Sequence, residues 1–546
     1  MWQRPLLSGL HPISTASCSC GRTNGVTVGG ATTTQPFKLA SSRGKNLSAA
    51  GEGAMVLSII LTLSLVLFFT VFILLSWSRQ HGYKSLPPGP TPIPVLGTPQ
   101  YMDLKNLKNF KKLSQEYGSV YTIWRMSEPV IVLCGFEAMK DALINHAEQF
   151  SARPIIPVNY VFSKGYDIAG PRWRSLRRFT MAFLKELGMG KKTMEMSVLE
   201  ETKYLIQAVL ETGGKPFNPT MSLSCALGNN ITVLAFGEHF DYQDKTLHEL
   251  LLSASRYIKG VNSPLSTLCN MVPVLLKIPT IRHKAVKDIL YIETYVTKSI
   301  KYHKEKFNPK SPKDYIDHFL LKMKEVEHEP DPDFCDTSLL VVAVGFLAGG
   351  VDTTSATLKF MLTLMAHLPD VQAKVHQEID EVTKSLRPPE IGDKPQMPFT
   401  NAVIHETQRV VDIAPTAFIH ATTEEVKFRG YTIPKGTPVI PFLTSVLMDP
   451  SQWETPDEFN TGHFLDEDGQ FHTKLACMPF SVGKRACPGE HLATMQLFLF
   501  FTSLLQKFTF TLPPGTERQD SKFLNLNKHQ ILAAGEICAE PRTFSK

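Results

Sequence analysis

The sequence predicts a mainly α-helical fold with a small β-rich region, preceded by an N-terminal transmembrane helix. Apolar residues recur with helical spacing over most of the chain, a few short segments have strand character, and one long uncharged stretch lies near the N-terminus. With 546 residues and 43% hydrophobic residues, the chain can bury a large core. We therefore expect one large helical body, residues 96–546, behind a membrane anchor.

The anchor is expected over residues 55–77. No charged residue occurs from Gly53 to Ser78, and the apolar run from Met55 to Leu75 is long enough to cross a hydrocarbon core of roughly 30 Å at about 1.5 Å per residue. A cleaved signal peptide is the alternative, but its apolar region would span only about 7 to 15 residues before a small-residue cleavage site. The length therefore favours an anchor.

Residues 1–54 carry five basic residues, one acidic residue and many Ser, Thr and Gly. This composition predicts a disordered extension. It also resembles an organelle transit peptide, which makes the mitochondrion an alternative location.

Residues 78–95 form a basic and proline-rich hinge in this interpretation. The string Leu86–Pro94 contains five prolines, and proline fixes φ and removes a backbone donor. The segment therefore cannot be helical, and we expect a semi-rigid spacer that orients the body against the bilayer.

Three short segments read as strands: 120–123, 130–133 and 437–440. Pro438 confines the last of them to a sheet edge or to the start of a strand.

Residues 338–368 resemble a second membrane span. However, Asp352 and Lys359 leave uncharged runs that are too short to cross a bilayer, and Gly349-Gly350 would weaken an isolated helix. A long buried core helix that ends before Pro369 fits better.

The bulk composition excludes several classes of protein. A net charge of +6, spread along the chain, does not indicate a nucleic-acid binder. Nine cysteines without paired spacing argue against a disulfide framework, so we expect the catalytic part to face a reducing compartment.

The most informative segment is Phe480–Gly489, which holds Cys487 between two glycines. Pro488 is a good first helical residue, so a positive helix end beside Cys487 would favour its thiolate. Such a thiolate can hold a metal or attack an electrophile. A buried structural cysteine is the alternative, and a cysteine hydrolase would also need a histidine base beside the sulfur.

The pattern Phe-x-x-Gly-x-Arg-x-Cys-x-Gly is matched at every fixed position, and it resembles the haem-binding loop of the cytochrome P450 family. The resemblance covers residues 86–541 and is closest to vertebrate microsomal family 2, on the strings His420–Thr423, Thr444–Leu447 and Phe498–Ser503. The segment Val272–Leu276 resembles the D subfamily. The resemblance to the family implies a cytochrome P450 fold that binds haem b (iron protoporphyrin IX), with Cys487 as the axial ligand of the iron.

The same resemblance assigns further roles. Gly349–Thr354 matches the oxygen-activation motif, in which Thr353 would hold the oxygen to be activated and Asp352 would feed protons from solvent. Glu406 and Arg409 would join His463 to lock the core on the thiolate side, although a lone Glu-x-x-Arg is often only a weak surface pair.

The haem propionates need cations or donors. The resemblance offers four candidates for that role: Trp173, Arg177, His420 and Arg485. Other cations are candidate docking charges for an acidic electron donor: Arg172, Arg174, Arg178 and Lys484.

The implied reaction is monooxygenation of an apolar small molecule (a xenobiotic, fatty acid or steroid) by O2. Electrons would come from NADPH through NADPH-cytochrome P450 reductase, with cytochrome b5 as a second candidate partner and membrane lipid as the surroundings. Two other classes stay open: a haem-thiolate isomerase or dehydratase, which would not need Asp352 and Thr353, and a non-catalytic haem-binding protein.

A few further residues bear on the substrate and on the location of the protein. At the places where D-subfamily members anchor amines with acidic residues, the chain has Val261 and Gly345, which argues against an amine preference. The expected cavity walls are residues 150–169, Phe346, Gly349 and residues 413–415. Microsomal relatives begin with their anchor, so we favour a functional chain that starts at Met55, in the endoplasmic reticulum membrane with a cytosolic catalytic domain.

Overall fold

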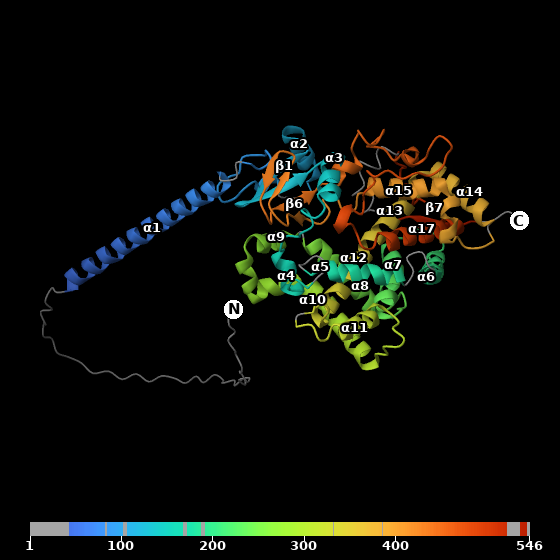
Figure 1. Ribbon diagram of the computed structural model, residues 1–546, viewed down its shortest axis with the longest axis horizontal. Helices are drawn as coiled ribbons and strands as arrows, with labels where there is room; N and C mark the ends of the chain where they lie inside the picture. The colour runs from blue at the N-terminus through green and yellow to red at the C-terminus, as the bar shows by residue number, and fades with distance from the viewer. Residues whose placement is uncertain are drawn as a thin grey trace, which may run out of the picture. The chain divides into compact units, whose positions relative to one another are not determined.

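The computed structural model describes residues 43–81, 85–101, 106–166, 172–186, 192–261, 263–330, 332–384, 386–520 and 535–542. The chain divides into two compact units, residues 1–70 and 71–546. Figure 1 shows the elements of the larger unit with the labels used below.

Helix α1 (Arg43–His81) contains the apolar run Met55–Leu75, and none of the most apolar part of this run is buried within the protein. The helix begins inside the segment expected to be disordered and ends inside the expected hinge, so it extends beyond the expected anchor at both ends. Once an apolar helix is nucleated, each further residue adds one hydrogen bond at low cost, and the alanines before Met55 favour its extension. The expectation for residues 1–42 lies outside the described residues.

The proline-rich segment is not helical, as predicted, but it is not a free spacer. Thr122 donates from its backbone N–H to the carbonyl of Pro88 and from its hydroxyl to the carbonyl of Pro87, both at 2.8 Å. A Cβ on Gly89 would lie 1.9 Å from the Thr122 carbonyl oxygen, so only glycine permits this approach. The segment is therefore docked on strand β1.

The main sheet has the order β1-β2-β6-β3, with β1 and β2 antiparallel, β2 and β6 parallel, and β6 and β3 antiparallel. Its strands are β1 (Val120–Arg125), β2 (Glu128–Leu133), β3 (His420–Ala421) and β6 (Pro438–Pro441). Two small hairpin-like pairs complete the β structure: β4 (Val426–Phe428) with β5 (Tyr431–Ile433), and β7 (Phe508–Thr511) with β8 (Cys538–Pro541). All three predicted strands are confirmed, and Pro438 stands at a strand start.

Helices build the rest of the larger unit, and most of them share one large apolar core. The α-helices that precede the central pair are α2 (Leu107–Tyr117), α3 (Phe136–Lys140), α4 (Pro157–Ser163), α5 (Trp173–Glu186), α6 (Lys192–Leu210), α7 (Thr220–Phe236), α8 (Lys245–Val261), α9 (Pro264–Met271), α10 (Pro279–Lys306) and α11 (Tyr315–Glu325). Those that follow it are α14 (Pro369–Thr383), α15 (Pro398–Val411), α16 (Thr444–Leu447) and α17 (Glu490–Lys507). Shorter helical turns are η1 (Pro99–Tyr101), η2 (Asp141–Asn145), η3 (Pro273–Lys277), η4 (Ile391–Gln396), η5 (Thr461–Phe464) and η6 (Gly483–Arg485).

The predicted long core helix is present but divided. Helix α12 (Asp336–Gly350) and helix α13 (Asp352–His367) meet at Val351, whose φ is −96° and ψ is −64°. The Thr353 hydroxyl donates to the Gly349 carbonyl at 2.9 Å, and this side-chain bond competes with the backbone ladder at a pair of glycines. Most residues of the pair are buried, including half of its most apolar stretch, and it packs against α7, α10, α15 and α17 (Figure 1), which favours a core helix in place of a second span.

Candidate functional site

Cys487 lies in the loop between η6 and α17. The loop is closed by the Cys487 N–H, which donates to the Phe480 carbonyl at 2.9 Å. Gly483 has a φ of +77°, and a Cβ there would lie 1.9 Å from the Leu143 carbonyl oxygen, so this position requires glycine. Gly489 is the N-cap of α17, and a Cβ on it would stand 3.8 Å from the Cys487 sulfur.

The Cys487 side chain is reachable by solvent although its loop packs into the protein. Burial raises the pKa of the thiol, and the backbone N–H groups of Gly489 and Glu490 only partly offset that effect. The helix end thus favours the thiolate, as expected, but burial has the larger effect on the thiol of the chain alone. Pro488 also lies before the N-cap, so it is not the first helical residue. A cation on the sulfur would reverse the preference, since a coordinating thiol loses its proton.

Three of the predicted residues surround this loop with positive and aromatic groups. Arg177, on α5, donates from Nη2 to the Ala486 carbonyl at 2.6 Å, directly beside Cys487. The buried Arg485 guanidinium lies over the Trp173 ring, 3.7 Å from its centroid, and Arg485 Nε donates to the Ser151 carbonyl at 2.7 Å. The loop and the first turns of α5 are thus joined.

His420, on β3, completes the set from the sheet side. Its Nδ1–H donates to the Phe150 carbonyl at 2.7 Å, and its buried Nε2 has no hydrogen-bond partner among the residues that the structure describes. Burial, with a further contribution from the charges of Arg153 and Arg485, lowers the pKa of His420 to about 3. In this neutral ring Nε2 is an acceptor, but an anionic group bound beside it would favour its protonation, and Nε2–H could then donate to that group.

Arg153 is a member of the site that the sequence reasoning missed. It donates to the carbonyls of Phe418 and Ile419, the latter at 3.0 Å, and burial together with the charge of Arg177 lowers its pKa to about 10. Among the described residues neither Arg153 nor Arg177 forms a salt bridge. A lone cation in the apolar stretch that follows Ala152 was the signal available in the sequence.

Asp352 and Thr353 are the first two residues of α13. Three positions at helical spacing, Gly345, Gly349 and Thr353, are open to solvent although most of α12 and α13 is buried. A Cβ at Gly345 or Gly349 would meet no atom within 4 Å. The three positions form an open stripe along one side of the helix pair. None of the hydrogen bonds and ring contacts described above joins this stripe to the Cys487 cluster.

The residues expected to line the cavity lie in different environments. The ring of Phe346 packs on Tyr315 at a centroid distance of 4.7 Å, so it belongs in part to an aromatic cluster with α5 and α11. Ile413 and Ala414 are exposed. Residues 167–169 of the predicted wall lie outside the described residues.

These residues fit a haem group. A reachable thiol offers a soft ligand, the cations Arg153 and Arg177 lack carboxylate partners in the described chain, and His420 Nε2 is unpartnered. A glycine-lined open stripe supplies room for a ligand against a helix backbone. One group that carries a metal and carboxylates would satisfy each of these requirements.

Glu406, Arg409 and His463 form a buried network, as predicted. Glu406 pairs with Arg409 at 2.7 Å, and both side chains are fully buried. His463 Nδ1 lies 3.2 Å from the Glu406 carboxylate. Arg409 also donates to the carbonyls of three residues, Leu447, Pro456 and Glu458, so it holds the segment ahead of the cysteine loop.

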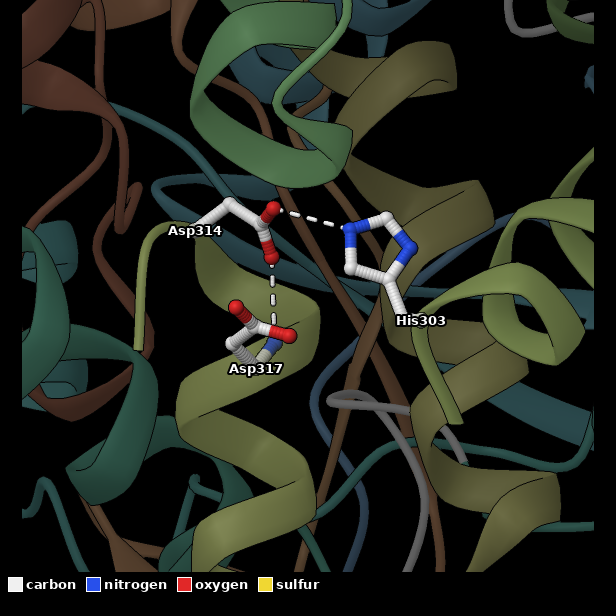
Figure 2. Close-up of side chains that lie close together, drawn as sticks. All are labelled: His303, Asp314 and Asp317. Atoms are coloured by element: carbon white, nitrogen blue, oxygen red, sulfur yellow. Dashed lines mark hydrogen bonds and ion pairs between the residues drawn. The ribbon is translucent and has the colours of Figure 1, made fainter. Parts of the chain in front are cut away.

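A second titratable cluster, His303, Asp314 and Asp317, has ligand atoms within 4.8 Å of one another. Figure 2 shows that its members are hydrogen-bonded to each other: His303 Nε2 to Asp314 at 2.8 Å, and the Asp317 N–H to Asp314 at 3.0 Å. The other His303 nitrogen donates to the Ser299 carbonyl at 2.8 Å, so each polar group of the cluster has a hydrogen-bond partner within the protein. The cluster is a buried cap that joins α10 to the start of α11.

Comparison with known proteins adds independent findings. A model of the cytochrome P450 family matches residues 87–532. Cytochrome P450 2C39 of Mus musculus is 42% identical over 450 residues, which cover 81% of this chain and 92% of that protein. Cytochrome P450 2C7 of Rattus norvegicus is 41% identical over 450 residues, with 81% and 92% covered. Both relatives bear 2C names, and the likeness to the D subfamily stays a prediction.

Proposed function

The chain belongs to the cytochrome P450 family, and from that membership we propose that it oxidises apolar small molecules with electrons that NADPH supplies through a reductase. It is a P450 monooxygenase with haem b as its cofactor. When bound, haem supplies the activation of O2 from which one oxygen atom enters the substrate and the other leaves as water.

We assign the thiolate ligand to Cys487. The observation that carries this assignment is the reachable sulfur beside Arg177, in a loop whose Gly483 allows no side chain. Four residues would hold the propionates by charge and hydrogen bonding: Arg153, Arg177, His420 and Arg485. Trp173 would orient Arg485 through its ring.

Asp352 and Thr353 would manage protons. The Thr353 hydroxyl lies on the open stripe and accepts no bond from another described side chain, so it is available to a ligand there. Asp352 is half-buried at the start of α13 and would connect that hydroxyl to solvent. Small residues at Gly345 and Gly349 leave this stretch of backbone accessible.

The apolar substrate class is a proposal of the same kind. The open stripe carries no charged side chain at Gly345, which argues against an ion pair with an amine. We therefore expect substrates such as xenobiotics, fatty acids or steroids, to be identified by incubating the holoenzyme with mixed lipids and drug-like compounds and analysing the products by mass.

The experiment that tests the reaction is reconstitution with NADPH-cytochrome P450 reductase. Substrate-dependent NADPH consumption with a product heavier by one oxygen atom is expected. Conversion without NADPH would favour the isomerase or dehydratase class. Binding without either would indicate a non-catalytic haem protein. Cytochrome b5 would be added to the same assay as a second donor.

We place the protein in the endoplasmic reticulum membrane with a cytosolic catalytic part. The support is the unburied apolar run Met55–Leu75 and the basic residues Arg79 and Lys84 after it, which follow the positive-inside tendency. Digestion of the catalytic part by protease added to intact microsomes is expected. Its protection, or import of the full chain into mitochondria, would contradict this placement.

A further inference from the structure

The loop that carries Cys487 contacts η2 and the segment that follows it. Gly483 approaches the Leu143 carbonyl so closely that a Cβ would overlap it. Arg485 Nε donates to the Ser151 carbonyl at 2.7 Å, in the buried interior. These two contacts fix the register between the loop and the segment, one on each side of the ion pairs described next.

Between those contacts, Glu148 forms ion pairs with two cations. Its Oε2 lies 2.6 Å from Arg174 Nη2, and its Oε1 contacts Lys484 Nζ. The exposed fractions of the three side chains are 55% for Glu148, 61% for Arg174 and 44% for Lys484. The pairs thus lie at the surface, where an approaching protein would meet them.

The pairing matters because Arg174 and Lys484 belong to the set proposed to bind an acidic electron donor. Arg178, also exposed on α5, forms no salt bridge with a described residue, whereas Arg172 is paired with Asp333. Glu148 therefore presents, within the chain, the same carboxylate chemistry that a donor would bring to Arg174 and Lys484.

We propose that Glu148 is an intramolecular counter-charge that competes with the acidic electron donor for Arg174 and Lys484. The inference rests on the proposed function, because it assumes that a reductase docks on this face. Exposed ion pairs are weak, so Glu148 lowers donor affinity without preventing docking. Removing its charge strengthens the positive field at the face and frees two cations for the partner.

The test uses the full-length holoenzyme in phosphatidylcholine vesicles, titrated with NADPH-cytochrome P450 reductase. The measurement is the reductase concentration that gives half the maximal rate of haem reduction, at several salt concentrations. In Glu148→Gln this concentration falls roughly two- to fivefold, which is the effect of freeing one or two exposed pairs. The dependence on salt becomes steeper, because more exposed charge is engaged across the interface.

The matched control is Glu200→Gln, which removes an equally exposed carboxylate paired with Lys203 on α6. It leaves the half-saturating concentration unchanged. A similar gain in Glu200→Gln would overturn the inference, because it would show that net charge alone is responsible.

A double-mutant cycle distinguishes masking from a general charge effect. If Glu148 masks Lys484, then Lys484→Gln weakens donor binding more in the Glu148→Gln background than in the parent chain. If the two effects were additive, the inference about Glu148 would be overturned. If Lys484→Gln alone still weakened donor binding in that case, the proposed docking face would stand. If neither Lys484→Gln nor Arg174→Gln altered donor binding, the proposed docking face and the inference would both fail.

Discussion

The Arg485 guanidinium rests on the indole of Trp173 at 3.7 Å from the ring centroid, which joins the cysteine loop to the first turn of α5. Because Arg485 Nε also donates to the Ser151 carbonyl, its remaining N–H groups are directed by two fixed contacts. A flexible lysine ammonium could supply the charge at this place but neither the planar stack nor the forked geometry.

Arg485→Lys is therefore expected to weaken haem retention even though charge is conserved. The loss should amount to roughly tenfold or more in haem dissociation rate, measured by transfer of haem to apomyoglobin. Lys484→Arg, the neighbouring exposed position, serves as the control and should leave the rate unchanged. Equal retention in Arg485→Lys and the parent would show that only charge matters.

Cys487→Ser should remove the thiolate ligand. The reduced carbon monoxide complex of the parent is expected to show the long-wavelength band that names the family, and the variant should lack it. Cys477→Ser, at a partly buried thiol earlier in the same segment, is the control and should keep the band. A band that persisted in Cys487→Ser would contradict the assignment of the ligand.

Thr353→Ala should separate oxygen chemistry from binding. The variant is expected to retain haem and substrate affinity while about tenfold more of the NADPH consumed appears as hydrogen peroxide, since proton delivery is disturbed. Thr357→Ala is the matched control, because its hydroxyl makes the same kind of bond, to the Thr353 carbonyl at 2.8 Å, from a buried position. If Thr353→Ala produced no more hydrogen peroxide per NADPH than the parent, Thr353 would have no role in proton delivery.

The pair of His303 and Asp314 should make stability depend on pH. Burial alone would lower the pKa of His303, but hydrogen bonds to Asp314 and to the Ser299 carbonyl outweigh it and raise the pKa to about 9. A raised histidine pKa contributes stability that is full below the unfolded value of 6.5 and is lost as pH rises through about 9. The contribution is on the order of 3 kcal/mol at most.

His303→Gln should accordingly lower the thermal unfolding temperature at about pH 6 more than at about pH 10. Lys304→Gln, which breaks an exposed pair with Asp336 on the same helix, provides the control and should show no such dependence. Parallel profiles for His303→Gln and the parent would indicate that His303 carries no proton in the folded chain.

Local patterns explain what the sequence could predict. The strands 120–123 and 130–133 and the buried character of residues 338–368 depend on neighbouring residues, and the structure confirms them. The break at Val351 depends on a side-chain hydroxyl that competes for one carbonyl, which periodicity does not register. The proline-rich segment was expected to be a spacer. Its docking depends on Thr122, which tertiary packing brings beside it and which the local sequence does not reveal.

The residues around Cys487 also include some that the sequence indicated and some that only the structure reveals. Cys487, Arg177 and Arg485 were expected in the site because the segments that contain them resemble motifs of the cytochrome P450 family. Arg153 enters the site only because β3 is brought beside the residues after Phe150, and Glu148 meets Lys484 across 336 positions of sequence. Long-range contacts of this kind carry no local signal in one sequence.

The docking of Pro87 and Pro88 on β1 has a consequence for how the protein behaves in a crowded cell. Strand β1 is the free edge of the main sheet, and such edges invite pairing with strands of other molecules. Two prolines present carbonyls to Thr122 but have no N–H with which to continue a ladder outward. The segment that follows α1 thus covers the outer edge of β1 with groups that cannot continue the sheet, which disfavours strand pairing with another molecule.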